Sequence, residues 1–459
     1  MPQKIFTTTN PANGELLECY PEFSAPDLER ALEAAMAAQR IWRASDFSAR
    51  ADRLRRLAAL LRERQDRYAF RMAREMGKVV PEGRAEIEKC ARACDFFTAH
   101  GEAMLRPDII PTEAHRSWVD YLPLGVVFAV MPWNFPFWQV CRSALPALLA
   151  GNGFLLKHAP NVLGCASELE ALFRDAGFPE GLVRSLVVDI PQVAGVISDR
   201  RIAAVTLTGS VHAGRAVGAL AGQALKKCVL ELGGSDPFIV LADADLDRAV
   251  FAAVTSRFQN CGQSCIAAKR FILVDAVREA FLERFIAQVR MLQVGDPCDP
   301  DSTMGPLARV DLREKLHAQV ERTVAAGARR LCGGLRPRGP GAFYPPTVID
   351  QVPPGSPARE EELFGPVAAV MTVPNEAQAV SVANDTSYGL AASVWTSDLE
   401  RGERIGRAIE SGLCFINREP FSDPRLPFGG IKQSGYGREL SQFGVREFVN
   451  VCSVWVDRV

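Results

Sequence analysis

The sequence predicts an α/β protein built on a parallel sheet that is covered by helices on both faces. Two observations support this prediction. Short, wholly apolar segments alternate with helical segments between residues 125 and 223, and segments of the same style recur between residues 228 and 418. Apolar strands without a polar face are typical of buried parallel sheets, and alternating strands and helices are typical of α/β domains. A length of 459 residues is enough for two or three domains.

The first hundred residues are predicted to be mostly helical. Residues 26–75 are rich in Ala, Leu, Arg and Glu, and their leucines recur at helical spacing. The same pattern continues over residues 82–104 and ends before Pro107 and Pro111, because proline cannot continue a helix interior.

The next segment carries the first predicted sheet. Apolar runs such as GVVFAVM and GFLLK are separated by helical stretches. Open parallel sheets bind ligands beyond the carboxyl ends of their strands, often nucleotides. We expect strands at residues 125–131, 153–157, 183–188 and 203–207, and helices at residues 144–150, 168–176, 193–198 and 212–223.

The second half predicts another α/β domain. Its candidate strands are CVLELGG, PFIVL, RFILV, AAVMTV, AASVWT and CFIN, and we expect the seam between the domains near Gly233 and Gly234. The tail, residues 448–456, alternates loosely between apolar and polar residues and predicts an edge strand. A lone terminal strand needs a pairing partner, and another subunit is one candidate.

Composition and charge exclude several classes of protein. The formal net charge is −1, so no broad basic surface indicates a nucleic-acid partner. The N-terminal MPQKIFTTTNPANGE lacks the apolar core of a secretory signal. The longest apolar stretch, residues 122–131, is too short to cross a membrane. We therefore expect a cytoplasmic protein with neither a nucleic-acid nor a membrane partner.

The cysteines do not predict a metal site or a disulfide scaffold. The 12 cysteines are scattered, no CxxC pair occurs, and histidine occurs only five times. Most cysteines are expected to be small buried residues. Cys261 stands four residues before Cys265, so an oxidative disulfide between them is one hypothesis and simple packing is the other.

Three segments carry residues suited to catalysis. Cys265 lies in the polar loop FQNCGQSC before an apolar strand, where a thiol can be exposed and activated. Glu231 lies at the end of the apolar run CVLE, where desolvation would raise its pKa toward that of a general base. Asn134 follows the first strand in MPWNFPFWQ, where its amide can donate to an oxyanion. Each residue alone also allows a purely structural role.

Taken together, these segments resemble the aldehyde dehydrogenase superfamily. PWNFP, LELGG and GQSC occur in the order and spacing of that family, with TTTNPANGE, TLTGS, EELFGP and PFGGIKQSGYGRE elsewhere in the chain. The resemblance implies that Cys265 is the nucleophile that attacks the aldehyde carbon. It implies that Asn134 stabilises the oxyanion and that Glu231 activates the water that hydrolyses the thioester.

The resemblance also implies a nicotinamide cofactor and its contacts. Trp133, Lys157, Gly209, Ser210, Glu362 and Phe364 match the residues that hold it. Many family members carry a glutamate three residues after this lysine, where it binds the adenosine ribose, but this chain has Pro160 there. A 2′-phosphate would then meet less repulsion, although proline offers no group to hold it. We expect NAD, with NADP as the alternative.

Several stretches resemble the succinate-semialdehyde dehydrogenase branch of the family. Arg142 follows Asn134 by eight residues, where an arginine of that branch binds the distal carboxylate of the substrate. A second arginine of that branch is replaced by Gln259, and Arg418 and Arg425 are the candidates to compensate for it. The aromatic residues of PWNFPFW, Phe137 among them, are expected to wall the substrate pocket.

The expected substrate is a short aldehyde, with succinate semialdehyde first. Glutarate semialdehyde or a neutral aldehyde would be oxidised by the same chemistry, and a non-enzymatic protein of the same fold is a distant alternative. The resemblance implies a cofactor domain over 1–112 and 125–232 and a catalytic domain over 233–440. It also implies an oligomerisation arm over 113–124 and 441–459, in a homodimer or a homotetramer.

Overall fold

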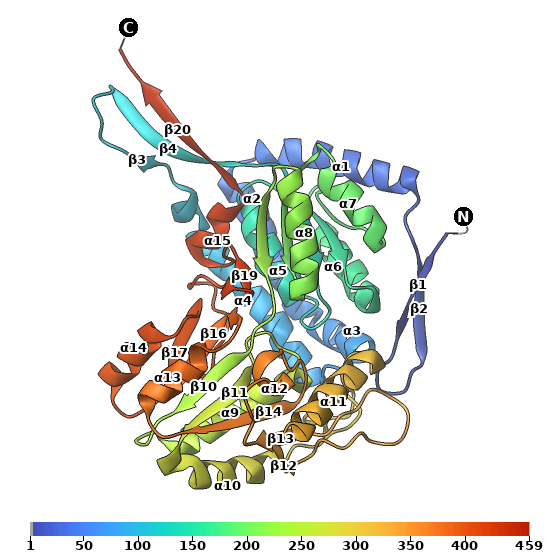
Figure 1. Cartoon of the computed structure of the whole chain (residues 1–459). Helices are drawn as coiled ribbons and strands as arrows, with labels where there is room; N and C mark the ends of the chain where they lie inside the picture. The colour runs from blue at the N-terminus through green and yellow to red at the C-terminus, as the bar shows by residue number, and fades with distance from the viewer. Residues whose placement is uncertain (1–2, 459) are drawn as a thin grey trace.

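The computed structural model describes residues 3–458, so residues 1, 2 and 459 of the expected ranges 1–112 and 441–459 lie outside it. Two sheets with flanking helices form the two halves of the body (Figure 1). A narrow β arm that carries the C-terminal strand projects from the upper half in that view. Within residues 3–458, no helix is long and apolar enough to span a bilayer.

The first sheet has the strand order β19-β9-β8-β5-β6-β7 and is parallel except for β19. Successive residues of β5 alternate between two apolar clusters: Val127 and Ala129 in one, Val126 and Phe128 in the other. Both faces of the sheet are therefore buried, which explains the uninterrupted apolar runs. The strands are β5 (Val126–Met131), β6 (Gly153–His158), β7 (Val183–Ser185), β8 (Ile202–Thr208), β9 (Lys227–Glu231) and β19 (Gly435–Tyr436).

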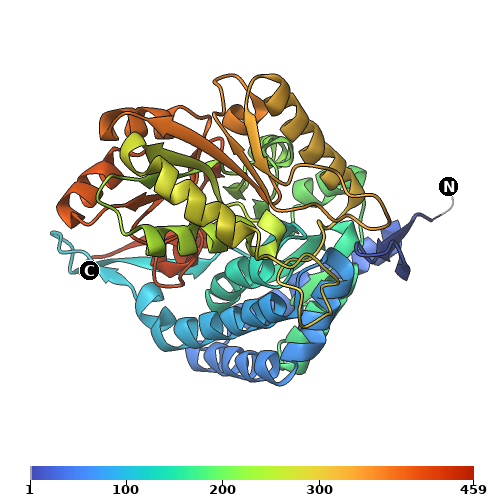
Figure 2. The same cartoon turned by 90° about the horizontal axis from the view of Figure 1, so that it is seen from below.

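Helices cover both faces of this sheet. One apolar cluster includes residues of α1, α7 and α8, and the other includes residues of α2 to α6. Figure 2 shows the long N-terminal helices along one edge of the body. The helices are α1 (Ala25–Arg43), α2 (Phe47–Glu63), α3 (Gln65–Met76), α4 (Val80–Leu105), α5 (Trp138–Leu149), α6 (Leu163–Asp175), α7 (Ile190–Ser198) and α8 (Val211–Gln223), with a 3-10 turn η1 (Pro160–Val162).

The second sheet has the order β12-β13-β14-β11-β10-β16-β17 and is parallel except for the β12–β13 pair. Its strands are β10 (Asp236–Val240), β11 (Ala268–Val274), β12 (Arg329–Cys332), β13 (Thr347–Asp350), β14 (Val367–Val373), β16 (Ala391–Trp395) and β17 (Leu413–Ile416). The helices of this half are α9 (Leu246–Phe258), α10 (Arg278–Val289), α11 (Val310–Ala325), α12 (Pro357–Glu360), α13 (Glu376–Asn384) and α14 (Leu399–Ala408), with 3-10 turns η2 (Gln259–Gly262) and η3 (Asp275–Val277).

The arm is a small antiparallel sheet in which β20 (Val449–Val456) pairs with β4 (Arg116–Pro123), and β4 pairs with β3 (Asp108–Ile109). Several large apolar side chains on it are exposed, including Ile109, Val451 and Trp455. The smaller remaining elements are the hairpin β1 (Ile5–Thr9) and β2 (Leu16–Pro21), the pair β15 (Tyr388–Gly389) and β18 (Ile431–Lys432), and α15 (Ser441–Glu447).

The structure moves some expected boundaries. Strand β9, which we grouped with the second-half strands, belongs to the first sheet. The second half was expected to end at residue 440, but the chain returns to the first half earlier, because β19 pairs with β9. Helix α15, which follows, packs against α4 and α5. The helix expected at 144–150 begins at Trp138, and the strand expected at 183–188 ends at Ser185.

Candidate active site

Cys265 lies between two cavities and lines both of them. The loop that leads to it is tightly turned, because Asn260, Cys261 and Gly262 all have positive φ angles, of 54°, 54° and 69°. A Cβ on Gly262 would lie 2.4 Å from the carbonyl oxygen of Gly365, so glycine is required there.

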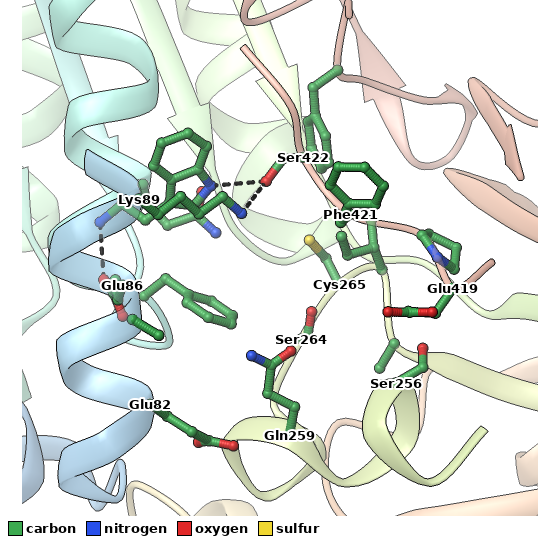
Figure 3. A pocket seen from close by; sticks show the side chains of 18 of the residues that line it. Glu82, Glu86, Lys89, Ser256, Gln259, Ser264, Cys265, Glu419, Phe421 and Ser422 are labelled. Atoms are coloured by element: carbon green, nitrogen blue, oxygen red, sulfur yellow. Dashed lines mark hydrogen bonds between the residues drawn. The ribbon is translucent and has the colours of Figure 1, made fainter. Parts of the chain in front are cut away.

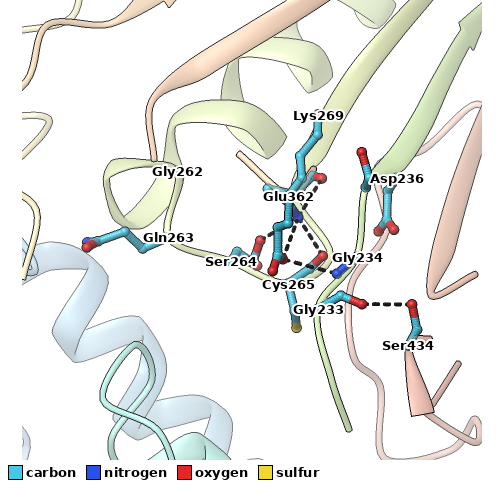
Figure 4. A network of polar contacts seen from close by, with 12 residues as sticks. Gly233, Gly234, Asp236, Gly262, Gln263, Ser264, Cys265, Lys269, Glu362 and Ser434 are labelled. Carbon is cyan, nitrogen blue, oxygen red and sulfur yellow. Dashed lines mark hydrogen bonds and ion pairs between the residues drawn. The ribbon is translucent and has the colours of Figure 1, made fainter. Parts of the chain in front are cut away.

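Buried side chains hold this loop in place. Both carboxylate oxygens of Glu82 accept from the backbone N–H of Asn260, at 3.1 and 3.0 Å. The Nζ of Lys269 donates to the carbonyl oxygens of Ser264 and Cys265, at 2.9 and 2.7 Å (Figure 4). The thiol is therefore carried on a fixed loop rather than on a mobile one.

Burial of Cys265 favours the protonated form of its thiol. Burial raises the pKa of Cys265 to about 11, and the positive charges of Arg142 and Lys269 oppose the shift only in part. Since the thiolate is the nucleophile, the reaction needs a base or a bound positive charge to lower this pKa.

Asn134 lies beside the nucleophile loop, as the sequence predicted for a residue at the end of the first strand. Its side-chain Nδ2 donates to the backbone carbonyl oxygen of Gln263 at 3.0 Å. The backbone carbonyl oxygen of Asn134 accepts from Nδ2 of Asn260 at 2.7 Å. A side-chain amide has two N–H donors, so one N–H of Asn134 is left for an oxyanion. The side chain is 3% exposed and lines the larger cavity.

Glu231 is buried at the end of β9, where its carboxyl group lies apart from the lining of both cavities. Within residues 3–458, neither of its carboxyl oxygens has a hydrogen-bond partner. Burial raises its pKa well above the usual value, and the neighbouring Glu439 raises it further. No hydrogen bond from the described residues therefore holds the carboxyl group in place, and it must turn toward Cys265 before it can act there.

The larger cavity has a volume of about 550 Å³ and contains most of the expected cofactor residues. Trp133 and Phe364 meet edge to face in its wall, with ring centroids 5.7 Å apart. Gly209 and Ser210 lie at the N-terminus of α8, where the Ser210 side chain accepts from the N–H of Ala213 at 3.2 Å. Glu362 accepts from the N–H of Gly234 at 3.0 Å and lies 3.5 Å from Nζ of Lys269 (Figure 4).

This cavity suits a dinucleotide. The N-terminus of the 13-residue helix α8 offers backbone N–H groups and a favourable dipole for a pyrophosphate. The aromatic pair offers apolar surface for a ring, and the carboxylate of Glu362 can accept from ribose hydroxyls. Lys157 lies outside this lining, at the end of β6, where its Nζ donates to the carbonyl oxygen of His158 at 3.3 Å and burial lowers its pKa.

The smaller cavity, of about 200 Å³, opens on the other side of Cys265 (Figure 3). This volume suits a short ligand, since pockets for drug-sized molecules are roughly 300–1,000 Å³. Arg142 and Gln259 line it, as expected for substrate contacts. Arg142 is already ion-paired with Glu439 and donates to Oγ1 of Thr208 at 3.3 Å.

The expectation for Phe137 is corrected by the structure. The ring is fully buried in the core against Tyr68, with centroids 4.9 Å apart, and it does not line the cavity. Its neighbours Phe135 and Trp138 line it instead. The reason is that α5 begins at Trp138, so Phe137 points into the helix packing. Arg418 and Arg425 are likewise absent from the lining, and Arg425 pairs with Asp423.

Sequence reasoning missed a set of charged residues on α4. Glu82, Glu86 and Lys89 all line the smaller cavity. Their spacing of four and three residues places them on one face of a helix. The sequence signal that could have identified them is this row of charged residues on a helix whose other face is apolar. Ser422, in the loop after β17, was missed because serine in a loop carries no pattern.

Comparisons with known proteins agree on one family. The model of the aldehyde dehydrogenase family matches residues 2–454. The chain is 51% identical to the NAD(P)+ succinate semialdehyde dehydrogenase of Escherichia coli K12, over 98% of this chain and 97% of that protein. It is 46% identical to an NADP+ succinate-semialdehyde dehydrogenase of Mycobacterium bovis, over 98% and 99% of the two chains. The crystal structure of a succinic semialdehyde dehydrogenase from Streptococcus pyogenes with NADP+ matches with a TM-score of 0.96 and 36% identity, over 99% of this chain and 100% of that one.

Proposed function

The chain belongs to the aldehyde dehydrogenase family, and we propose that it oxidises succinate semialdehyde to succinate with NAD+ or NADP+. The observation that carries the proposal is the position of Cys265, which lines both a cofactor-sized and a substrate-sized cavity. A thiol in that position can contact an aldehyde from one side and a nicotinamide from the other.

The chemistry begins at Cys265. The thiol gives its proton to a water molecule and its sulfur forms a bond to the aldehyde carbon, while the carbonyl π electrons move to the oxygen. The free N–H of the Asn134 amide and the backbone N–H of Cys265 stabilise that oxyanion, an effect worth about 10²- to 10³-fold in rate for one donor. A nicotinamide held in the larger cavity would supply the hydride acceptor, and loss of a hydride from the former aldehyde carbon leaves a thioester on Cys265.

Glu231 completes the reaction. Its carboxylate removes a proton from water, the water oxygen bonds to the thioester carbon, and the carbon–sulfur bond breaks to release the acid and regenerate the thiol. A carboxyl group whose pKa is raised by burial is a suitable base near neutral pH. Because neither oxygen has a hydrogen-bond partner within residues 3–458, no such bond opposes its rotation toward the thioester.

The residues that line the larger cavity are assigned to the parts of the cofactor as follows. Trp133 and Phe364 would flank the nicotinamide, Glu362 would bind its ribose, and Gly209 and Ser210 would bind the pyrophosphate. Lys157 would bind the adenosine ribose from the end of β6. We expect NAD to be used, with NADP accepted as well, because Pro160 replaces the acidic residue that would repel a 2′-phosphate.

A preference for an acidic short aldehyde is supported by the size of the smaller cavity and by the cations Lys89 and Arg142 in its lining. Gln259 and Arg142 line that cavity, and the similar proteins from E. coli and M. bovis are named for succinate semialdehyde. Glutarate semialdehyde is one methylene longer and is the alternative acidic substrate.

We expect the protein to be a cytoplasmic homodimer or homotetramer in which the arm meets another subunit. The exposed apolar side chains of β3 and β20 are the support for this interface.

The test is a substrate comparison with purified enzyme. The values of kcat/KM for succinate semialdehyde, glutarate semialdehyde and butanal are measured with NAD+ and with NADP+. We expect succinate semialdehyde to lead butanal by at least roughly 10-fold, the lower end for a hydrogen bond to a charged group. Equal values for the acidic and the neutral aldehyde would overturn the substrate assignment. Inactivity with every aldehyde would revive the non-enzymatic alternative.

A further inference from the structure

Helix α4 carries two glutamates that bind the backbone of two separate segments of the active site. Both carboxylate oxygens of Glu82 accept from the N–H of Asn260 in the nucleophile loop, at 3.1 and 3.0 Å. Glu86 accepts from the N–H groups of Phe137 and Trp138 at the start of α5, each at 2.9 Å. Residues four positions apart lie on one face of a helix, so a single face of α4 meets both segments.

The nucleophile loop needs such an anchor because its backbone is strained. Asn260 and Cys261 both have a φ angle of 54°, in the left-handed region that side chains other than glycine and asparagine rarely adopt. A conformation of this kind is costly and persists only where its surroundings hold it. Glu82 holds the first of the two strained residues. Figure 3 shows Glu82 projecting from α4 toward the segment that carries Gln259.

The segment that carries Asn134 has an anchor of the same kind. The N–H groups in the first turn of a helix have no partner within that helix, and the helix dipole favours an acidic side chain there. Glu86 accepts from two N–H groups at the start of α5, and its second oxygen pairs with Nζ of Lys78 in the buried interior. Lys78 in turn lies over the Phe135 ring, 3.8 Å from its centroid. These contacts fix residues 134–138, which we call the oxyanion segment.

Asn260 joins the two segments directly. Its Nδ2 donates to the backbone carbonyl oxygens of Asn134 and Gln263, at 2.7 and 3.2 Å. The side chain of Asn134 donates to that same oxygen of Gln263 at 3.0 Å, and Cys265 follows Gln263 by two residues. The oxyanion donor and the nucleophile are therefore parts of one hydrogen-bonded unit, which α4 anchors on both sides.

The two glutamates have no direct use in binding an acidic substrate. Both line the smaller cavity, where a free carboxylate would repel the acid group that the proposed function assigns to the substrate. The oxygens of Glu82 face the N–H of Asn260, and those of Glu86 are divided between two N–H groups and Lys78. Contacts with the backbone, rather than with a ligand, account for both residues.

We propose that Glu82 and Glu86 are positioning residues that set the separation between Cys265 and the amide of Asn134, and with it the rate at which the thioester forms. The inference rests on the proposed function, because it concerns the attack of the thiol on the aldehyde carbon. A displacement of a reacting group by about 1 Å can lower a rate about 10²-fold, so small movements of either segment should be measurable.

The contact at Asn260 depends on an acceptor of the right reach and not on charge. Burial raises the pKa of Glu82 to about 7, so a large fraction of this carboxyl group is protonated near neutral pH. A protonated carboxyl group still has acceptor oxygens. A neutral glutamine should therefore replace Glu82, whereas methionine, of similar length, offers only a weak acceptor.

The test compares Glu82→Met, which removes the acceptor, with Glu82→Gln, which keeps it. Single turnovers are followed by NADH formation in a stopped-flow instrument, with enzyme in excess over succinate semialdehyde and NAD+ saturating, so that thioester hydrolysis does not affect the rate. We expect Glu82→Met to be about 10- to 100-fold slower than the wild type, up to the cost of a displacement of about 1 Å. Glu82→Gln should recover most of the loss. Glu102→Met, on an exposed residue of the same helix, is the matched control and should equal the wild type.

Glu86 is tested in a background that lacks Lys78, because removing Glu86 alone would leave a buried cation without a partner. Lys78→Met/Glu86→Met should be slower in the single turnover than Lys78→Met/Glu86→Gln by about 10-fold or more, since only the second variant keeps an acceptor for the two N–H groups. Equal rates in the two double variants would contradict the assignment of Glu86.

A second readout distinguishes positioning from an electrostatic effect on the thiol. The rate of alkylation of Cys265 by iodoacetamide is measured against pH, with the modified peptide followed by mass spectrometry. The midpoint of this profile should be the same in the wild type, Glu82→Met and Glu102→Met, because Glu82 places the thiol without tuning it. A midpoint displaced in Glu82→Met alone would overturn the inference.

The outcomes separate this inference from the proposed function. If the wild type oxidises succinate semialdehyde and Glu82→Met does so at the same single-turnover rate, the positioning role is wrong and the proposed function stands. If the wild type does not oxidise this aldehyde, the proposed function fails and the inference fails with it. If Glu82→Met is recovered unfolded, Glu82→Asp takes its place. Its acceptor is one methylene short, so a single-turnover rate equal to that of Glu82→Gln would contradict the inference.

Discussion

The guanidinium of Arg142, which lines the smaller cavity, forms an ion pair with the carboxylate of Glu439, and each side chain is 2% exposed. The pair joins α5 to the segment after β19, two parts of the chain that lie almost 300 residues apart. Removing one member of a buried pair leaves the other charge uncompensated.

We therefore expect Glu439→Gln to destabilise the protein by about 3 kcal/mol, the lower end for breaking a buried pair. The double variant Arg142→Met/Glu439→Met should be less destabilised than Glu439→Gln, because neither charge remains. Thermal unfolding scans at one pH and scan rate compare the three proteins. Equal melting temperatures for wild type and Glu439→Gln would contradict a structural role for the pair.

Glu231→Gln should separate the two halves of the reaction. The glutamine cannot accept a proton from water, so hydrolysis of the thioester should slow by about 10²- to 10⁴-fold, the usual contribution of a general base. Formation of the thioester does not need this carboxylate. We expect a rapid burst of NADH close to one equivalent per active site, followed by slow turnover, in a stopped-flow measurement. Loss of the burst together with the steady rate would show that Glu231 acts before the thioester.

The cofactor prediction concerns the end of β6. Lys157→Ala should raise KM for NAD+ about 10-fold, in line with one hydrogen bond to a charged group, and change kcat less, because the residue is distant from the reacting atoms. Since Pro160 leaves no acidic group at the ribose, NADP+ should remain a substrate of both proteins. Initial rates at varied concentrations of each cofactor measure both effects. An unchanged KM would place the adenosine away from Lys157.

The parts of this protein that depend on local pattern could be predicted from the sequence. The run GVVFAVM became β5 because both faces of a parallel sheet are buried, so every residue of the strand must be apolar. Cys265, Asn134 and Glu231 could be named because each belongs to a distinctive segment. The structure brings the first two to one cavity and shows the third as a buried carboxyl group whose pKa is raised.

Features that depend on distant parts of the chain could not be predicted. The pairing of β19 with β9 joins residues about two hundred positions apart, and two residues are too few to show a strand pattern. The partner of Arg142 lies in a segment that the sequence assigned to another domain. Phe137 and Phe135 look alike in PWNFPFW, and only the start of α5 decides which ring points to the cavity.

The central claim is that Cys265 is the nucleophile of an NAD(P)-dependent oxidation of succinate semialdehyde. The most direct test is the formation of NADH and NADPH by wild type and by Cys265→Ala, under reducing conditions and with both proteins shown to be folded. We predict steady turnover by the wild type and none above background by Cys265→Ala, which should still bind the cofactor. Comparable turnover by the two proteins would contradict the account.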